Sequence, residues 1–131
     1  MMDHKAIILS VKTHFAHLIM SGKKVLEVRM KRLPSVDRIY IYASGEEKKV
    51  IGHCSFFGPV TVPYPWILRG ACLSDEEYVH YCKGRSPFVY RLRDVVRYGS
   101  PLDLSNFGKI HSPQSYVYTD FIPSSVLVGE S

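Results

Sequence analysis

The sequence predicts a small α+β domain, a mixed β barrel of about five strands with two or three short helices that close its ends. Three observations lead to this prediction. The chain has 131 residues, a length that suits one hydrophobic core. Its apolar residues alternate mostly with the period of strands, and only short stretches show helical spacing. The expected elements follow the order strand, helix, several strands, helix, strand.

One domain is expected over residues 1–131, with an ordered core to about residue 121 and a tail over 122–131 that lacks periodicity and frays. No run approaches the ~18 apolar residues of a membrane span. A charged start precedes only the short apolar run Ala6–Leu9, so we expect no signal peptide. The expected protein is cytoplasmic and monomeric.

The three cysteines are Cys54, Cys72 and Cys82, an odd count without a C-x-x-C pair. This pattern argues against a disulfide framework and against a cysteine zinc site. A mixed site of Cys72, His80 and Cys82 would lack a local fourth ligand. We therefore expect no metal and no cofactor.

The formal net charge of +5 indicates an anionic partner. Nucleic acid is the commonest such partner. The basic residues are spread over strands and loops and do not form one face of an amphipathic helix, so an acidic membrane surface is disfavoured.

The first elements are a strand and a helix. Lys5–Val11 is an apolar run that reads as a strand buried on both faces. The apolar spacing over Thr13–Ser21 predicts an amphipathic helix, with Thr13 as its N-cap. Gly22 stands where a left-handed turn would end this helix.

The segment Gly22–Arg32 predicts a strand with one apolar and one charged face. Glu27 is the lone carboxylate among cationic neighbours, which are Lys23, Lys24, Arg29, Lys31 and Arg32. This pattern favours a surface that faces an anion, with Glu27 orienting Arg29 or binding a donor of the ligand. The alternative is a solvated face with an ordinary ion pair, worth roughly 0 to 1 kcal/mol.

A hairpin follows, with strands over Arg38–Ser44 and Val50–Phe57. Gly52 marks a bulge or a close backbone approach in the second strand. Tyr40 and Tyr42 fall on the more polar side of the first strand. They are expected to pack at an edge with their hydroxyls in water, unless they contact a ligand.

The second half begins with a proline-rich stretch, in which Trp66 should anchor a short helical turn into the core. Ser74 starts a capping box and a helix that ends near Cys82. Pro87–Tyr98 predicts a long strand. The expected loops then run over residues 100–104 and 112–116.

The spacing of Gly22, Lys24, Glu27 and Arg29 resembles the G-x-K-x-x-E-x-R signature of the ASCH domain, a branch of the PUA-like superfamily. The resemblance extends over nearly the whole chain. Its other landmarks, in order, are Leu9–Lys12, Ile41–Ser44, Ile51–Gly52, Trp66, Glu77, Tyr81, Gly84, Pro101–Leu102 and Pro113–Tyr116.

The resemblance implies a PUA-like pseudobarrel whose cleft lies between the signature strand, the first helix and the late loop. It also implies binding of RNA or a modified nucleotide. The residues expected to bind are Lys12, Lys24, Glu27, Arg29, Arg32, Tyr42, Ser44, Gln114, Ser115 and Tyr116.

The chemistry of these side chains agrees with that expectation. Lysine and arginine neutralise phosphate, and the ring of Tyr42 or Tyr116 offers a stacking surface. Gln114 and Glu27 can bind a base edge. Because RNA is read through unpaired bases, we expect a basic cleft for one single-stranded or flipped nucleotide.

Two other functions stay open. The first is an RNA-acting hydrolase in the same cleft. Resemblance to amidohydrolases of N4-acetylcytidine matches Lys24, but Glu27 replaces their threonine. Resemblance to metal-independent ribonucleases implies Tyr42, Lys48 and Ser115, with Lys24 and Glu27 as further catalytic candidates. The second is a protein-interaction or regulatory domain.

Overall fold

The computed structural model describes residues 5–123, which form six strands, three α-helices and one 3-10 helix. The elements are β1 (Ala6–Lys12), α1 (Thr13–Met20), β2 (Leu26–Arg29), β3 (Arg38–Ser44), β4 (Lys49–Phe57), α2 (Tyr64–Ala71), α3 (Asp75–Cys82), β5 (Phe88–Leu102), η1 (Leu104–Phe107) and β6 (Tyr116–Thr119). No helix in this part of the chain has the length and apolar character needed to cross a membrane.

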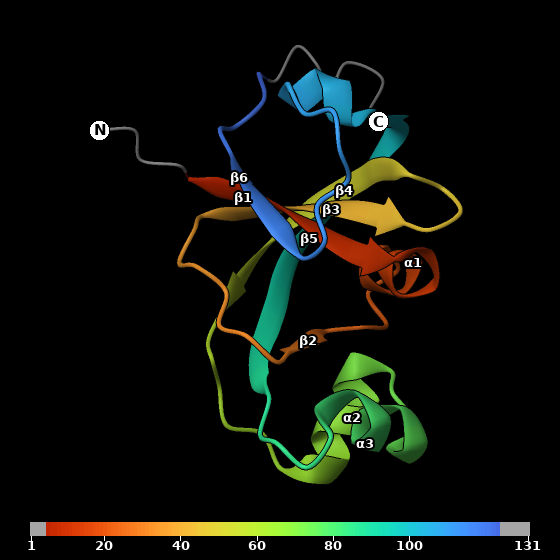
Figure 1. Ribbon diagram of the computed structural model, residues 1–131, viewed down its shortest axis with the longest axis vertical. Helices are drawn as coiled ribbons and strands as arrows, with labels where there is room; N and C mark the ends of the chain where they lie inside the picture. Colours follow the sequence, from red (N-terminus) through yellow and green to blue (C-terminus); the bar gives the residue numbers. More distant parts are fainter. Residues whose placement is uncertain (1–4, 124–131) are drawn as a thin grey trace.

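The strands form one sheet in the order β2-β5-β4-β3-β1-β6. The sheet curls into a half-barrel, with α1 beside the end of β1 and with α2 and α3 together near β2 (Figure 1). The α+β barrel-like prediction is confirmed. The sequence indicated about five strands, and the sixth is β6, of which only Tyr116 lies in an expected loop and the other residues had no predicted element. Four residues are too few to show an alternating strand pattern in the sequence, and β6 is a strand because it pairs with β1.

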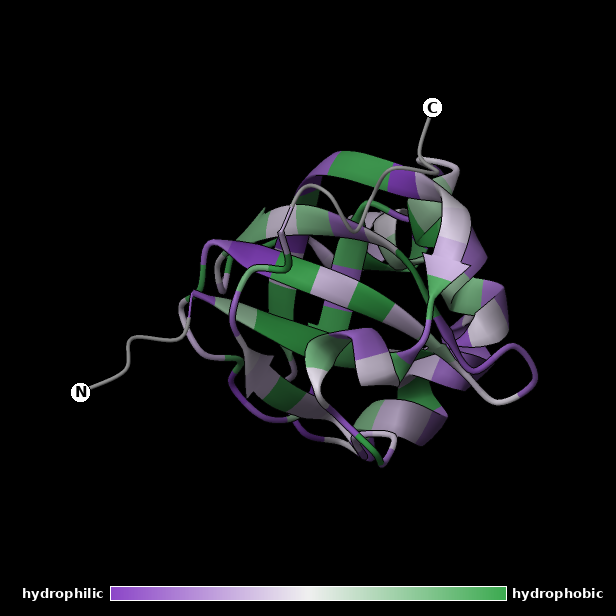
Figure 2. Cartoon of the chain, turned by 90° about the horizontal axis from the view of Figure 1, so that it is seen from above, coloured by the Kyte–Doolittle hydropathy of each residue, from purple (hydrophilic) through white to green (hydrophobic). Residues whose placement is uncertain are grey.

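The strand β1 is buried on both faces, as its apolar run predicted. It pairs in parallel with β3 and antiparallel with β6. Ile7 and Leu9 belong to one hydrophobic cluster and Ile8 to another. The sheet therefore has a core on each side, and hydrophobic residues recur along its strands (Figure 2).

Two glycines have the roles that the sequence indicated. Gly22 has a φ of +83° and follows α1. Gly52 lies in β4 at a shift of register with β3. A Cβ atom at Gly52 would lie 2.3 Å from the Val96 carbonyl oxygen and 2.3 Å from the Met20 sulfur. Close approach of α1 and β5 to β4 thus excludes a side chain at Gly52.

The start of α1 differs from the prediction. Thr13 does not cap the helix, because the cap position is Lys12 and no side chain accepts a hydrogen bond there. The Thr13 hydroxyl donates instead to the Ser44 carbonyl oxygen at 2.8 Å. Thr13 therefore ties α1 to the end of β3.

Tyr40 and Tyr42 do not hold their hydroxyls in bulk water, contrary to the expectation. Both side chains are buried in the second core cluster. The Tyr40 hydroxyl accepts the Ile122 backbone N–H at 3.1 Å, and the Tyr42 hydroxyl lies 2.8 Å from Ser112 Oγ. Leu104 and Phe107 of η1 and Ile122 near the C-terminus pack against this cluster, a long-range effect that alternation within β3 does not reveal.

The role predicted for Trp66 is wrong. Its side chain is 56% exposed, and Ile67 and Ala71 provide the buried contacts of α2. These two residues are four positions apart and share one helix face, which turns Trp66 toward solvent. The proline-rich stretch does form a helix, with Pro63 at its N-cap position.

Helix α3 begins as predicted, whereas β5 and the C-terminal tail differ from their predictions. The capping box of Ser74 and Glu77 opens α3 as predicted. Strand β5 runs on to Leu102, through part of an expected loop, because it pairs with β4 along its length. Ile122 was assigned to a frayed tail but is buried against the second cluster. Residues 124–131 of that tail lie outside the described residues.

Stability should depend on pH through His53, a buried side chain whose Nδ1 lies 2.6 Å from the Tyr98 hydroxyl. Burial, together with the charge of Arg38, lowers the pKa of His53 to about 4. An unfolded histidine has a pKa of about 6.5, so the unfolded chain binds the extra proton first as pH falls. The free energy of unfolding should therefore decrease between about pH 6.5 and pH 4.

Chemical denaturation at a series of pH values measures this dependence. His53→Gln should flatten the profile in that window, whereas His111→Gln, at an exposed position, should leave it unchanged. An equally steep profile in the His53→Gln variant would show that another group is responsible.

Candidate functional site

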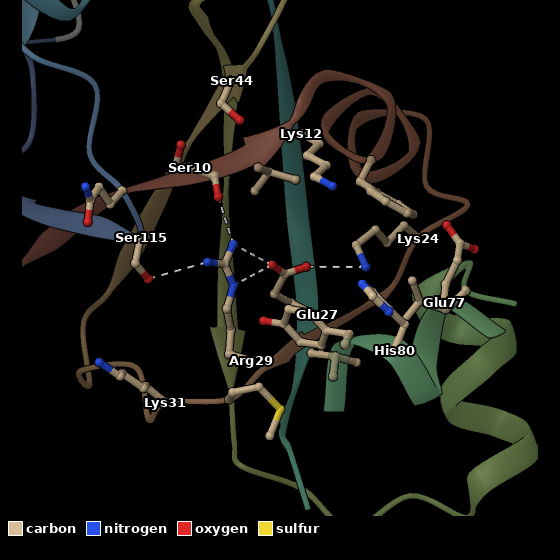
Figure 3. Close-up of a pocket in the computed structure, with 17 residues that line it drawn as sticks. Ser10, Lys12, Lys24, Glu27, Arg29, Lys31, Ser44, Glu77, His80 and Ser115 are labelled. Carbon is tan, nitrogen blue, oxygen red and sulfur yellow. Dashed lines mark hydrogen bonds and ion pairs between the residues drawn. The ribbon is translucent and has the colours of Figure 1, made fainter. Parts of the chain in front are cut away.

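A pocket of about 600 Å³ opens beside the signature segment, and we call it the Glu27 pocket. The end of β1, the start of α1, β2, the end of β3, α3 and the loop before β6 all contribute to it (Figure 3). Its lining residues are Ser10, Val11, Lys12, Phe15, Lys24, Glu27, Val28, Arg29, Met30, Lys31, Ser44, Leu73, Glu77, His80, Tyr81, Gln114 and Ser115.

Glu27 lies at the centre of an ion-pair network. Its Oε2 accepts a hydrogen bond from Arg29 Nε at 2.7 Å and lies 2.7 Å from Arg29 Nη2. Its Oε1 lies 3.3 Å from Lys24 Nζ. The Glu27 side chain is only 7% exposed, so the carboxylate is almost removed from water. Both of its oxygens are occupied by cations of the protein.

The guanidinium of Arg29 is held from three sides. Besides Glu27, its Nη2 donates to the Ser10 carbonyl oxygen at 2.9 Å. Its Nη1 makes a long contact of 3.5 Å to the Ser115 hydroxyl. Planar guanidinium groups bind phosphate and carboxylate through parallel donors. Nη1 is thus the nitrogen best placed to donate to a ligand in the pocket.

Lys24 is unusual because its ammonium is buried, with 4% of the side chain exposed. It donates to the Ala71 carbonyl oxygen at 2.9 Å, at the end of α2. It also lies 5.3 Å from the ring centroid of Phe15. A buried ammonium is costly unless it is paired, which Glu27 and this carbonyl accomplish.

The lining is cationic overall. Four lysine or arginine side chains face two carboxylates, and Glu27 is already paired inside the network. Lys12 and Lys31 are exposed at its rim. Its lining therefore holds more cationic than acidic side chains, and its volume lies in the range of small-ligand sites.

Seven of the ten residues predicted to bind are brought together in this pocket: Lys12, Lys24, Glu27, Arg29, Ser44, Gln114 and Ser115. The other three do not line it. Arg32 lies over the Phe88 ring, and Tyr116 packs edge-on against Tyr118. Tyr42 is buried in the second core cluster.

Two residues predicted for the catalytic set also lie apart from the pocket lining. Lys48 is exposed in the turn between β3 and β4, with a φ of +56°. Tyr42 reaches the loop before β6 through its contact with Ser112 Oγ. That loop also carries Ser115, so Tyr42 contacts a loop that contributes to the pocket.

Sequence reasoning missed the wall formed by α3. It treated Glu77 as a helix-start residue and gave His80 no role in the cleft, yet both line the pocket with Tyr81. A hydrogen bond from the Ser74 backbone N–H lowers the pKa of Glu77. Burial raises the pKa of Tyr81. The four-residue spacing of Glu77 and Tyr81 on one helix face was the available signal.

Residues 5–123 contain no cluster of three or more histidine, cysteine or carboxylate side chains that could hold a metal ion. The Glu27 pocket itself carries lysine and arginine side chains together with His80 and Tyr81. It can bind an anion, stabilise developing negative charge, and move a proton through His80 or Tyr81.

The sequence and the structure of the chain were compared with those of known proteins. No protein-family model matches the chain. A curated protein of Zymomonas mobilis, named an ASCH domain-containing ribonuclease, is 32% identical over 129 residues, which cover 88% of this chain and 85% of the relative. The crystal structure of ASCH from Zymomonas mobilis has a TM-score of 0.76 at 29% identity, over 96% of this chain and 95% of that one.

Two mutant structures from the same organism are similar. A serine-to-alanine mutant gives a TM-score of 0.75 at 27% identity, over 98% of this chain and 97% of that one. A tyrosine-to-phenylalanine mutant gives 0.74 at 28% identity, over 95% and 96%. Sequence and fold agree over nearly the full length, and the chain belongs to the ASCH domain family.

Proposed function

We propose that this protein acts on RNA and that the Glu27 pocket binds one nucleotide of a single strand. The observation that carries the proposal is the Arg29 guanidinium, which Glu27 and Ser10 hold in place while its Nη1 makes only a long contact with Ser115 of the pocket lining. Because this cation is already oriented, it loses little side-chain conformational entropy when it binds a phosphate or a base oxygen.

The surrounding side chains suit a nucleotide. Lys12 and Lys31 at the rim are placed to neutralise backbone phosphates. Phe15 and Tyr81 offer ring surfaces within the lining. Gln114 carries both a donor and an acceptor for a base edge. Glu27 serves as a positioning residue, because both of its oxygens already face cations.

RNA affinity across a salt series tests this function. In the wild-type protein, log K for a short single strand should fall with log salt concentration, by about 0.7 for each phosphate contact. Lys12→Ala should weaken binding and reduce that slope by about 0.7. Lys5→Ala removes an equally exposed charge outside the pocket and should change neither quantity. Salt-independent binding, or equal effects of the two variants, would refute the proposed phosphate contacts.

Cleavage of the bound RNA is the second candidate, favoured by the ribonuclease name of the curated relative. Figure 3 shows the His80 ring and the Lys24 ammonium on the same side of the pocket. In this mechanism the RNA 2′-oxygen bonds to the adjacent phosphorus and the bond to the 5′-oxygen breaks. His80 takes the 2′-hydroxyl proton, Lys24 and Arg29 stabilise the charge of the phosphorane, and the leaving 5′-oxygen takes a proton from water. Tyr42, Lys48 and Ser115 stay in the candidate set through the family resemblance.

Labelled single-stranded RNA incubated with and without a chelator distinguishes cleavage from binding alone. A metal-independent ribonuclease gives the same products in both samples, and His80→Gln should abolish them while RNA affinity is retained. Intact RNA in all samples, with tight binding, would leave the binding module as the function. The protein is also incubated with N4-acetylcytidine. If this nucleoside keeps its acetyl group, the amidohydrolase alternative is excluded.

A further inference from the structure

A second pocket of about 600 Å³ lies on the other side of the segment that leads into β2. We call it the Trp66 groove, after the exposed indole at its edge. Trp66 and Arg69 of α2, Arg91 of β5, and Lys23 and Val25 before β2 line it. Trp66 is 56% exposed and Val25 is 39% exposed, so the groove presents an aromatic and apolar surface to solvent.

The charge of the Trp66 groove has one sign. Its lining holds the cations Lys23, Arg69 and Arg91 and, among the described residues, no carboxylate. All three of these side chains are exposed. The Arg69 guanidinium lies 4.9 Å from the Trp66 ring centre, which fixes a cation beside a stacking surface. This combination matches the features of surfaces that bind single-stranded nucleic acid.

One backbone segment, which we call the wall, leads into β2 and contributes to both the Trp66 groove and the Glu27 pocket. Lys23 lines the groove and Lys24, the next residue, lines the pocket. Their Cα atoms are about 3.8 Å apart, because they share one trans peptide bond. The Val25 N–H donates to the Gly70 carbonyl at 2.8 Å, and the Val25 carbonyl accepts the Leu92 N–H at 2.9 Å. The wall is therefore fixed to both α2 and β5.

We propose that the Trp66 groove binds a second stretch of the same single-stranded RNA whose nucleotide occupies the Glu27 pocket. A base stacks on the Trp66 indole, and Arg69, Arg91 and Lys23 contact the adjoining phosphates. This inference rests on the proposed function for its ligand, but its residues are separate from those of the Glu27 pocket. It makes affinity depend on RNA length.

The exposed indole favours RNA over an acidic peptide. Phosphates or carboxylates would satisfy the cations, but stacking on Trp66 beside Arg69 needs a planar partner, which each nucleotide supplies. Phe57, with 38% of its surface exposed, continues this chemistry at the end of β4, where Arg93 lies 4.3 Å from its ring centre. Arg91 of the groove lining is the register partner of Phe57 in the neighbouring strand.

Trp66 is the only tryptophan in the sequence, so intrinsic fluorescence reports on the groove directly. The full chain is titrated with uridine monophosphate, with oligouridylates of two and eight nucleotides, and with oligoglutamate. The eight-nucleotide RNA should change the emission, and the mononucleotide should not. Unchanged emission at saturating eight-nucleotide RNA, or an equal response to oligoglutamate, would overturn the proposal.

Affinity measurements with variants give a second readout. Trp66→Ala should weaken binding of the eight-nucleotide RNA about tenfold, as expected for the loss of one stacked base. Arg69→Ala combined with Arg91→Ala should reduce the salt slope by about 1.4, for two phosphate contacts. Binding of the dinucleotide should be unchanged in both. Ile110→Ala, at an exposed apolar residue outside the groove, is the matched control.

The two proposals fail in different ways. If the Trp66 groove does not bind RNA, the groove variants equal the wild type while Arg29→Gln still reduces affinity. If the Glu27 pocket does not bind RNA, Arg29→Gln has no effect, and the fluorescence response to the eight-nucleotide RNA remains as evidence for the groove.

Discussion

Glu27→Ala is expected to lower the free energy of unfolding by about 3–5 kcal/mol, because it leaves two largely buried cations without a counter-charge. Lys24 is 4% and Arg29 is 14% exposed in their side chains. For a chain of this length the loss corresponds to a decrease in Tm of about 10–20 °C. Thermal and chemical denaturation measure it.

A second variant distinguishes the effect of an unpaired buried charge from the effect of the lost side-chain volume at position 27. Lys24→Met combined with Glu27→Leu replaces this buried pair by apolar groups and should recover part of the loss. Glu46→Ala removes an exposed carboxylate and should change stability by less than about 0.5 kcal/mol. If Glu27→Ala is as mild as Glu46→Ala, the network does not stabilise the fold.

Arg29→Gln is expected to have the largest effect on function, a loss of RNA affinity of about 100-fold. Hydrogen bonds to charged groups contribute about 1.5–3 kcal/mol each, and Arg29 Nη1 has only a long contact of 3.5 Å, to the Ser115 hydroxyl. The loss should exceed that of Lys12→Ala, since Lys12 is exposed at the rim. Equilibrium binding of a short single-stranded RNA measures the difference.

Arg29→Lys is the informative control, because it keeps the charge but loses the planar donors. It should retain more of the stability than Arg29→Gln and still bind RNA weakly. Melting curves of both variants show whether the fold persists. Wild-type affinity in a folded Arg29→Lys protein would mean that charge alone is sufficient and that guanidinium geometry does not matter.

The local elements of this fold were largely predictable from sequence. The apolar run around Ile8 predicted a strand buried on both faces, and Ser74 with Glu77 predicted the start of α3. The strand β6 was not predictable in this way, because its regularity comes from pairing with β1. Trp66 was misplaced because residue type suggested burial, whereas the phase of α2 turns Ile67 inward.

The candidate site was predicted in part. The spacing of Lys24, Glu27 and Arg29 indicated an anion-binding arrangement, and the structure brings these side chains into one pocket. The alternation of side chains along the predicted strand placed Glu27 on its charged face. The burial of Glu27 depends on the packing of α2 and α3 beside β2, which this alternation does not reveal. The contribution of His80 depends on the same packing, and no local pattern encodes it.

A crystal structure of the protein with a short single-stranded RNA tests the central claim most directly. We expect a phosphate or base oxygen within hydrogen-bond distance of Arg29 Nη1, with Glu27 still paired to Lys24 and Arg29. RNA bound elsewhere, with the Glu27 pocket empty of nucleotide, would contradict it.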